Sequence, residues 1–304
     1  MALTLFSFYY NLVKGAHLYK NAMGEQPKIT NLSEFYNWVK NCHSVHNDEI
    51  DSSFLVTPFY RGQSDTGFKS IVPSLYREGS KSSDLEFRLI NKASRMLWGE
   101  MRKYSSYTEK LIFLQHYGLP TRLLDITSNP LVALYFACNK DSDKDGKVYS
   151  GYYRERDFSN SELCERIIKY VFSKGEDIVS PQDLGEIYGT QNRRNRDLLE
   201  SPELIYPPLN NPRLQAQSGA FLMAPLVEMA GDNAIKRTDF RDSFVKLFEN
   251  SAVIPHGYKS SLLKELYEIG INEATLFPEI EHKLRYINEI VSHEAIEFDV
   301  NNNQ

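Results

Sequence analysis

The sequence predicts an α+β fold, in which helices and strands are mixed around a common core. Capping signals and apolar residues at helical spacing mark several helices, and short apolar or alternating runs mark strands between them. These elements do not alternate regularly as they would in a doubly wound sheet. The 304 residues can bury one large core or two small ones.

The first helix is predicted to begin near Asn31. Asn31 and Glu34 have the spacing of a capping box, in which each side chain satisfies a free backbone N–H of the other. Its apolar face is expected to consist of Leu32, Phe35, Tyr36 and Val39. The apolar run 54–60 then predicts a strand that ends at Arg61-Gly62.

Two more helices are predicted before residue 120. One begins at Ser83, with Glu86 at the capping-box position. Its buried stripe is expected to consist of Leu85, Leu89, Ala93, Met96 and Leu97. The other covers residues 108–117 and ends at Gly118, because glycine suits the left-handed position after a helix.

A strong helix start follows at Asn129-Pro130. Asparagine is a good N-cap, and proline fits the first helical position, so residues 131–138 are expected to form a buried helix. A charged turn at 141–146 and an alternating strand at 147–153 come next.

The second half of the chain is expected to be helical at first. Residues 155–200 read as helices, one of which opens at Ser180-Pro181. An amphipathic helix at 259–269 is closed by Gly270. Strands are predicted at 213–223 (with Gly219 inside), at 244–248 and at 252–254.

Composition limits the class of protein. The formal charge of -5 argues against a chain that coats nucleic acid by charge alone, although a local basic groove remains compatible with it. The 19 tyrosines and 17 phenylalanines suit either stacking sites and interfaces or an ordinary aromatic core. Three widely separated cysteines (Cys42, Cys138 and Cys164) argue against a disulfide framework or a zinc site and fit a reducing cytoplasm.

Several familiar site patterns are missing from the sequence. It has no phosphate loop, no dinucleotide glycine fingerprint, no nucleophile elbow and no zinc-protease helix, which excludes those enzyme classes. No run of about 18 apolar residues predicts a membrane-spanning helix. Residues 1–10 lack the basic start and cleavage site of a signal peptide. We therefore expect a cytoplasmic protein with no membrane segment and no metal.

Three polar segments stand within apolar surroundings, at 59–63, 115–125 and 213–219. Arg61, at a strand end, could fork onto a phosphate or form a salt bridge across the sheet. Gly62 would let a ligand approach the backbone. In the second segment Arg122 and Asp125 could hold a ligand or pair with each other. Gln217 could position a nucleophile or be an ordinary surface amide.

Together these segments resemble the FRG domain, which is named for its Phe/Tyr-Arg-Gly signature. The residues that carry the resemblance lie at 60–63, 73–77, 115–125, 129–137, 213–221, 254–255, 259 and 276–279. The resemblance covers about 55–285, which leaves 1–54 as an aromatic-rich, helical N-terminal extension and 286–304 as a C-terminal tail. One departure is Ile126, where the family commonly carries Trp.

The resemblance implies an ADP-ribosyltransferase-like mixed sheet core with surrounding helices, and the use of NAD. In such transferases an arginine at this strand end holds the phosphates of NAD, which points to Arg61. The candidate NAD-binding residues are Tyr60, Arg61, Gln63, Arg77, Thr121 and Arg122, and Tyr76 or Tyr117 could also supply a stacking ring. The candidate catalytic residues are Gln217, to which the resemblance points, together with Asp125 and His116, although His116 could instead be a structural hydrogen-bonding group at a helix end. Gln217 stands where such transferases usually carry a glutamate.

FRG proteins also resemble toxins of bacterial anti-phage modules. This resemblance implies RNA, above all messenger RNA, as the substrate, and an antitoxin and a chaperone as protein partners. The alternatives are a protein-modifying ADP-ribosyltransferase, a non-enzymatic module that binds nucleotide or nucleic acid, and a scaffold whose residues 1–28 dock a partner. The basic run 191–196 could contact RNA or be a solvated helix end.

Overall fold

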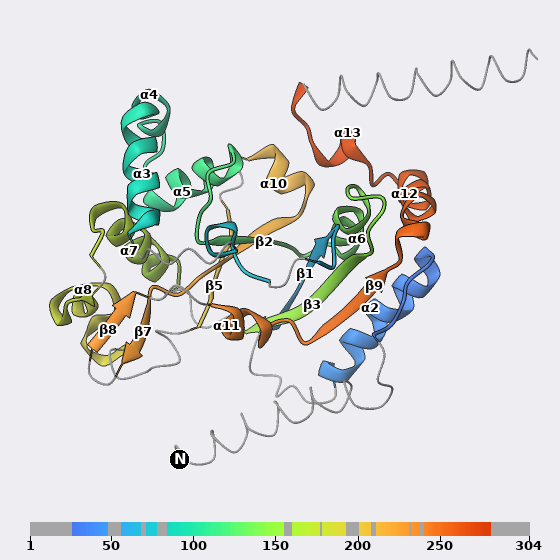
Figure 1. The fold of residues 1–304 in the computed structure, drawn as a ribbon, viewed down its shortest axis with the longest axis horizontal. Coiled ribbons are helices and arrows are strands. Elements are labelled where there is room, and N and C mark those ends of the chain that lie inside the picture. Colours follow the sequence, from blue (N-terminus) through green and yellow to red (C-terminus); the bar gives the residue numbers. More distant parts are fainter. Residues whose placement is uncertain are drawn as a thin grey trace, which may run out of the picture.

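The computed structural model describes residues 26–47, 56–67, 71–77, 84–154, 160–176, 178–192, 201–207, 211–230, 233–236 and 240–280. This part of the chain forms a six-stranded antiparallel sheet and a three-stranded sheet, with helices packed around them (Figure 1). The predicted α+β class is confirmed. Within the described part of the chain, every helix is too short or too polar to cross a membrane.

The larger sheet has the strand order β5-β6-β2-β1-β3-β9. Its strands are β5 (Glu203–Ile205), β6 (Gly219–Met223), β2 (Leu123–Thr127), β1 (Val56–Gln63), β3 (Gly146–Arg154) and β9 (Asn250–Ile254). The smaller sheet has the order β4-β8-β7, formed by Ile178–Val179, Asn233–Lys236 and Val227–Ala230.

The larger sheet is split between β1 and β2. β1 pairs with β3 at eight consecutive positions, from Val56 to Gln63. In the described residues, β1 and β2 share one paired position, Tyr60 with Thr127. The sheet therefore consists of two ribbons, β5-β6-β2 and β1-β3-β9, which are joined at one point and separate beyond it.

Helix α6 (Pro130–Cys138) packs directly on the β1-β3-β9 ribbon. A Cβ atom on Gly62 would lie 1.9 Å from the carbonyl oxygen of Ala133, and one on Gly146 would lie 2.2 Å from that of Ala137. These two glycines thus let the helix backbone approach the sheet. The prediction that Gly62 makes room for a ligand is wrong, because α6 fills that space.

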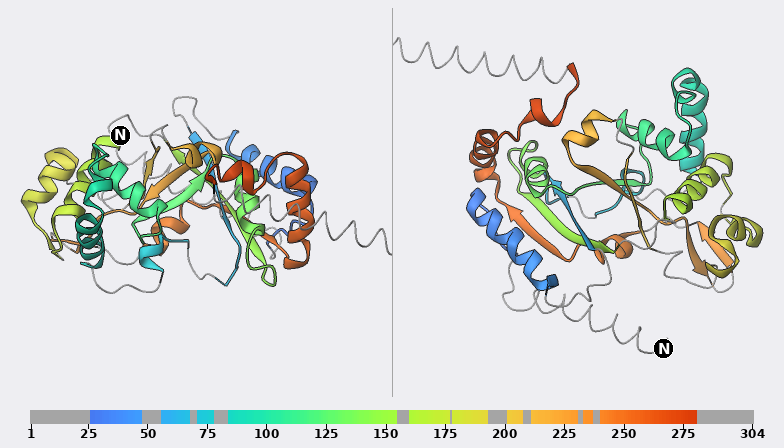
Figure 2. Two further views of the ribbon diagram at one scale, coloured as in Figure 1. Left: turned by 90° about the horizontal axis from the view of Figure 1, so that it is seen from above. Right: turned by 180° about the vertical axis from the view of Figure 1, so that it is seen from behind.

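Two more helices, α2 (Leu32–Asn47) and α12 (Lys259–Glu268), complete this half of the molecule. The core that they share with α6 includes Phe35, Trp38, Val132, Leu134, Ile254, Leu262 and Leu266. The other ribbon packs against α5 (Tyr107–His116), α7 (Asn160–Ser173) and α8 (Pro181–Asn192), with α3 (Leu85–Met96) and α4 (Trp98–Met101) beyond them. Figure 2 shows the two helix groups at opposite ends of the molecule.

A third core covers the opposite face of the sheet and bridges both ribbons. It joins Phe59 of β1 and Leu124 and Ile126 of β2 to Phe244 of α11 (Arg241–Val245). The side chain of Ile126 is buried there and contributes to packing. The described residues also include the short helices η1 (Ser74–Tyr76), α10 (Pro212–Ala216), η2 (His256–Tyr258) and α13 (Glu273–Leu276).

The helices with the clearest capping signals are confirmed. The amide N–H of Glu34 donates to the side chain of Asn31 at 3.0 Å, and that of Leu131 donates to Asn129 at 3.0 Å. Gly118 and Gly270 follow α5 and α12 with φ values of 91° and 82°. The predicted strands at 147–153 and 252–254 are also present, as β3 and β9.

One predicted strand is right only in its second half, and another is wrong. Residues 212–216 form α10, because Asn211 caps them by accepting from Leu214 N at 3.2 Å and Pro212 occupies the first helical position. The strand β6 begins only at Gly219. The predicted strand at 244–248 overlaps α11. The short strand β2 was not predicted at all.

Two predicted apolar faces are partly wrong. Tyr36 of α2 is exposed, whereas Phe35 and Trp38 are buried. Met96 and Leu97, at the end of α3, are exposed as well. Residues 1–25 and 48–54 of the predicted N-terminal extension, the whole predicted C-terminal tail and residues 193–196 of the basic run lie outside the described residues.

Candidate functional site

Arg61 lies at the split between the two ribbons. Side chains alternate along β1, so Tyr60 and Gly62 face α6, whereas Arg61 and Gln63 face the other side. A terminal guanidinium nitrogen of Arg61 donates to the backbone oxygen of Asp125 at 2.5 Å and lies 3.9 Å from its carboxylate. Arg61 therefore bridges β1 and β2 beyond the point where their backbones pair.

The Arg61 side chain has unused hydrogen-bonding capacity. Its exposed fraction is 12%, and its Nε has no hydrogen-bond partner among the residues that the structure describes. Burial lowers the pKa of Arg61 to about 10, against the opposing effect of Asp125, and the positive charge of Arg77 lowers it further. The group remains cationic at neutral pH.

Gln63 repeats this feature two residues along the same face. Its side chain is buried, and within the described part of the chain its Oε1 has no hydrogen-bond partner. Buried polar atoms are almost always satisfied in folded proteins. Two unsatisfied atoms on one face of one strand end therefore mark a place where an added polar group would be stabilised.

Asp125 presents the exposed carboxylate of the site. Its side chain is 67% exposed, although its neighbours in β2 are buried. The amide nitrogen of Gln115 donates to it at 2.8 Å, and the hydroxyl of Thr121 donates to the amide oxygen of Gln115. We call Arg61, Gln115, Thr121 and Asp125 the Arg61 cluster. Thr121 is fully buried, so it orients Gln115 rather than meeting a ligand.

No role for Gln115 was predicted from the sequence, although this residue belongs to the polar segment 115–125. It is the link that connects the end of α5 to the exposed carboxylate on β2. A buried threonine six residues away is the signal that could have pointed to it, because a buried hydroxyl needs a partner.

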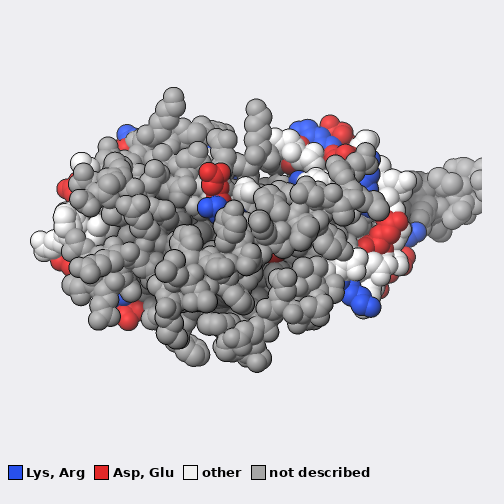
Figure 3. Space-filling model, turned by 90° about the horizontal axis from the view of Figure 1, so that it is seen from below, with Lys and Arg blue, Asp and Glu red and all other residues white. Residues whose placement is uncertain are grey.

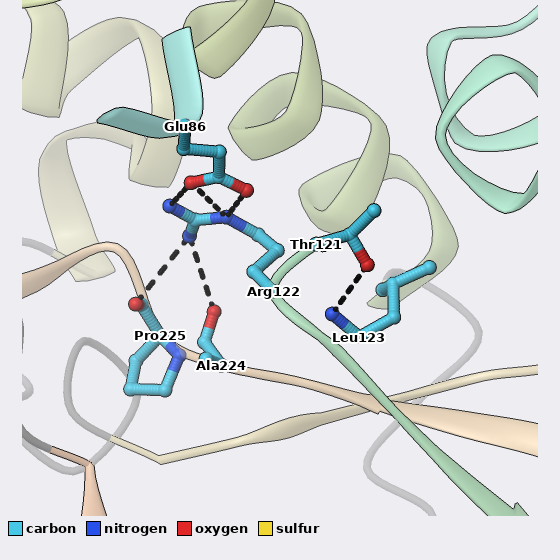
Figure 4. Close-up of polar contacts among 6 residues, drawn as sticks. All are labelled: Glu86, Thr121, Arg122, Leu123, Ala224 and Pro225. Carbon is cyan, nitrogen blue, oxygen red and sulfur yellow. Dashed lines mark hydrogen bonds and ion pairs between the residues drawn. The ribbon is translucent and has the colours of Figure 1, made fainter. Parts of the chain in front are cut away.

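Arg122 does not join the Arg61 cluster. Its guanidinium forms a forked pair with the carboxylate of Glu86, with contacts of 2.6–3.1 Å (Figure 4). Its third nitrogen donates to the backbone oxygens of Ala224 and Pro225 at 3.2 and 3.4 Å. Both charged side chains are buried. The guanidinium is thus committed to internal contacts, which does not support the predicted phosphate-binding role and gives Arg122 a structural one.

The Arg122 pair also corrects the prediction for Glu86. This side chain was expected to cap α3, but it points into the core. Burial by itself would lower the pKa of Arg122, but Glu86 outweighs it, so the pKa lies above its usual value. The ion pair links α3 to the start of β2, and the remaining nitrogen of Arg122 links both to the segment that follows β6.

Tyr60 also lies in the core. Its side chain is buried, and its hydroxyl lies 2.6 Å from Nε2 of His43 on α2. Burial raises the pKa of Tyr60. Such a ring cannot stack on a ligand, so the geometry does not support the expectation that Tyr60 contacts NAD.

Arg77 is exposed near Arg61, and its Nε lies 3.4 Å from the backbone oxygen of Val72.

His116 belongs to a second polar group at the end of α5. Its Nε2 lies 3.7 Å from a carboxylate oxygen of Glu279, and a terminal nitrogen of Arg213 lies 3.8 Å from the same oxygen. Partial burial and then the charge of Arg213 lower the pKa of His116 below 6.5, although Glu279 opposes them. The imidazole is therefore largely neutral at pH 7 and can accept a proton.

Gln217 lies beside the paired end of β2. Its backbone oxygen accepts from the hydroxyl of Thr127 at 2.7 Å, and Thr127 is the residue that pairs with Tyr60. Its side-chain amide donates to the backbone oxygen of Leu276 at 3.1 Å. The fold thus brings Gln217 to the same strand as Asp125, but its amide nitrogen already has a partner.

The described residues show mixed charge on one face (Figure 3) and no cluster of metal ligands. Basic and acidic side chains lie next to one another on the face in Figure 3. Among the described residues, no three His, Cys, Asp or Glu side chains gather in a way that could hold a metal ion. The ligand chemistry of the Arg61 cluster is therefore that of a cation, a carboxylate and amides.

Comparison with known proteins gives one match. A family model described as the FRG domain matches residues 57–146. No curated protein and no solved structure matches the chain. The matched segment runs from β1 to the start of β3, so it holds the whole Arg61 cluster as well as Arg122 and its partner Glu86. This match supports the resemblance to the FRG domain over residues 57–146, and the Arg61 cluster lies within the matched segment.

Proposed function

We propose that the protein is an NAD-dependent ADP-ribosyltransferase that modifies RNA, with messenger RNA as the main target. In this proposal the split sheet and its helices form an ADP-ribosyltransferase-like core over residues 55–285. NAD supplies the ADP-ribosyl group, and nicotinamide is the leaving group. The observation that carries the proposal is the largely buried, cationic Arg61 at the split. Its Nε and the Oε1 of Gln63, on the same face of β1, have no hydrogen-bond partner among the described residues.

These atoms fit the groups that a dinucleotide presents. A guanidinium binds phosphate oxygens well, because its N–H groups form charge-assisted hydrogen bonds with them. Arg77 adds positive charge near Arg61. The amide oxygen of Gln63 accepts hydrogen bonds and can receive one from a hydroxyl or amide of the ligand.

The exposed carboxylate of Asp125 has a different role. Gln115 holds it in one orientation, and Arg61 holds the backbone beside it. An oriented carboxylate can hydrogen-bond ribose hydroxyls or stabilise the positive charge that develops on the ribose as nicotinamide leaves. The neutral imidazole of His116 is a candidate base for the acceptor hydroxyl.

The biological setting follows from the same proposal. A transferase that modifies messenger RNA would stop protein synthesis, which is the action of a toxin in an anti-phage defence system. Such a toxin requires an inhibitor, so we expect an antitoxin, accompanied by a chaperone, as protein partners. Expression of the chain alone should therefore arrest bacterial growth.

One observation favours a second candidate. The side chain of Gln217, which stands where such transferases usually have a glutamate, is an uncharged amide whose nitrogen donates to the backbone oxygen of Leu276. An FRG module that binds a nucleotide without transferring anything would need no carboxylate there. A transferase that modifies proteins shares the geometry of the first proposal and differs from it only in the acceptor.

The test uses NAD labelled on its adenylate part. The full chain is incubated with labelled NAD and either total cellular RNA or RNA-free cell extract. We expect label on RNA that ribonuclease releases, and a loss of about 100-fold or more in Arg61→Ala. Arg166→Ala is the matched control, because this half-exposed arginine pairs with Glu162 on α7 and, like Arg61, has a buried Nε with no hydrogen-bond partner among the described residues.

Each candidate has its own outcome in this test. Label that protease but not ribonuclease removes would assign the activity to proteins. Tight NAD binding with no release of nicotinamide would support the non-enzymatic module. No binding and no transfer by the wild-type chain would reject both NAD proposals.

A further inference from the structure

The junction of α3 and α4 exposes large apolar side chains. Met96 ends α3 and is 75% exposed, and Trp98 begins α4 and is 70% exposed. Figure 1 shows these two helices projecting from the rest of the fold. Isolated apolar residues on a surface are ordinary, but adjacent ones at the end of a projection are typical of a contact site.

Positive charges accompany these side chains. Lys92 and Arg95 lie on the same face of α3 as Met96, because residues three and four apart are neighbours on a helix. Arg102 directly follows α4. All three cations are exposed, and none forms an ion pair with another residue that the structure describes.

The acidic residues of this region are already engaged. Asp84 pairs with Arg88 at 3.0 Å, and Glu100 pairs with Lys103. Glu86 is buried against Arg122. The carboxylate of Glu109 caps the start of α5. The charges left over in the described part of this region are therefore positive.

A row of rings continues from α4 toward the Arg61 cluster. Tyr104 packs on Phe113 with ring centres 5.2 Å apart, and Phe113 packs on Tyr117 at 4.9 Å. Tyr117 is 73% exposed, and Lys110 lies on the same face of α5. The row ends beside His116 and two residues from Gln115, which holds the carboxylate of Asp125.

We infer that this region binds single-stranded nucleic acid and leads it to the Arg61 cluster. The α3–α5 surface consists of Lys92, Arg95, Met96, Trp98, Arg102, Lys110 and Tyr117. Bases stack on Trp98 and Tyr117, and backbone phosphates pair with the cations between them. The inference deepens the proposed function and rests on it, because it names the surface that would hold the RNA acceptor.

The charges favour nucleic acid over an apolar protein partner. Burying Lys92, Arg95 and Arg102 beneath such a partner would cost desolvation energy with no opposite charge to offset it. A polyanion supplies a phosphate for each cation. Single strands fit better than duplex, because only unpaired bases leave their faces free for exposed rings.

Trp98 supplies a direct probe. The chain has two tryptophans, and Trp38 is buried, so a change in tryptophan emission on adding RNA reports on Trp98. We expect single-stranded RNA to quench this emission in the absence of NAD. In fluorescence anisotropy with a labelled 12-nucleotide RNA, Trp98→Ala should weaken binding about 5- to 150-fold. Tyr36→Ala is the control, because it removes an exposed ring on α2, far from α3 and α4 (Figure 1).

The salt dependence tests the cations separately. Lys92→Ala/Arg95→Ala should reduce the slope of log affinity against log salt concentration by about 1.4, since each lost phosphate contact on a single strand accounts for about 0.7. The control Lys40→Ala/Lys264→Ala removes two exposed lysines from α2 and α12 and should leave the slope unchanged. All four variants should melt at the wild-type temperature, because the altered side chains are exposed.

Two results would overturn the inference. One is equal RNA affinity of the wild type and Trp98→Ala, with no quenching. The other is the absence of RNA binding together with a protein partner that Trp98→Ala no longer retains, which would assign the surface to protein. RNA binding that depends on Trp98 without any transfer of label would support the α3–α5 surface and reject only the proposed transferase.

Discussion

Arg61 and Arg122 lie in neighbouring parts of the same sheet, yet their surroundings differ. Arg122 has a carboxylate on one side and two carbonyl oxygens on the other, and all of these lie in the core. Arg61 donates to one carbonyl oxygen and lies 3.9 Å from an exposed carboxylate, and its Nε has no hydrogen-bond partner in the described part of the chain. A paired arginine holds a fold together, whereas a partly paired one at a strand end can bind a ligand.

The largest effect is expected from breaking the Arg122 pair. Glu86→Ala leaves a buried guanidinium without its carboxylate, which should cost about 3–5 kcal/mol of unfolding free energy. Denaturant unfolding followed by circular dichroism measures it. Glu100→Ala is the control, because its pair with Lys103 is exposed and such pairs contribute little. A loss below about 1 kcal/mol in Glu86→Ala would contradict the structural role of Arg122.

The next effect concerns the glycine beside Arg61. In Gly62→Ala the added methyl group would overlap the backbone of α6, so we expect a loss of about 1–3 kcal/mol or more. Gly257→Ala is the matched control, because nothing lies within 4 Å of its added Cβ. If Gly62→Ala unfolds like the wild type but loses NAD binding, then Gly62 faces a ligand after all.

Removing Arg61 should affect stability much less than removing Glu86. Arg61→Ala loses one hydrogen bond to Asp125, so we expect a cost of about 1 kcal/mol in denaturant unfolding. A loss comparable to that of Glu86→Ala would show that Arg61 is a second structural arginine. That result would remove the difference between the two regions.

The smallest effect on stability is expected at Asp125. Its carboxylate is exposed, so Asp125→Asn should change the unfolding free energy by less than about 0.5 kcal/mol. The same variant should reduce label transfer more than NAD binding, because in the proposed reaction the carboxylate stabilises the positive charge that develops on the ribose as nicotinamide leaves. An equal loss of binding and transfer would place Asp125 among the binding residues instead.

Capping residues predicted the starts of α2 and α6 correctly. The Asn129-Pro130 start was recognised, and α6 begins there. The same Asn-Pro pair recurs at residues 211–212, but the run that follows was interpreted as a strand, and α10 was missed. The strand β2 was missed because the exposed Asp125 interrupts its apolar pattern.

Pairings across the sheet could not be predicted in the same way. The partner of Arg122 is Glu86, 36 residues away on a different helix. The approach of Arg61 to Asp125 depends on β1 and β2 being neighbours that separate after one paired position. Neither pairing can be predicted from neighbouring residues in the sequence. Arg61 and Arg122 were therefore similar candidates at first, and only the fold distinguishes them.

The most direct test is the affinity of NAD for the wild type and for Arg61→Ala, measured by isothermal titration calorimetry. Charged hydrogen bonds contribute about 1.5–3 kcal/mol each, so Arg61→Ala should bind NAD about 10- to 150-fold more weakly while keeping the wild-type fold. Arg166→Ala should bind like the wild type. Equal affinities of Arg61→Ala and the wild type would contradict the proposal that Arg61 binds NAD.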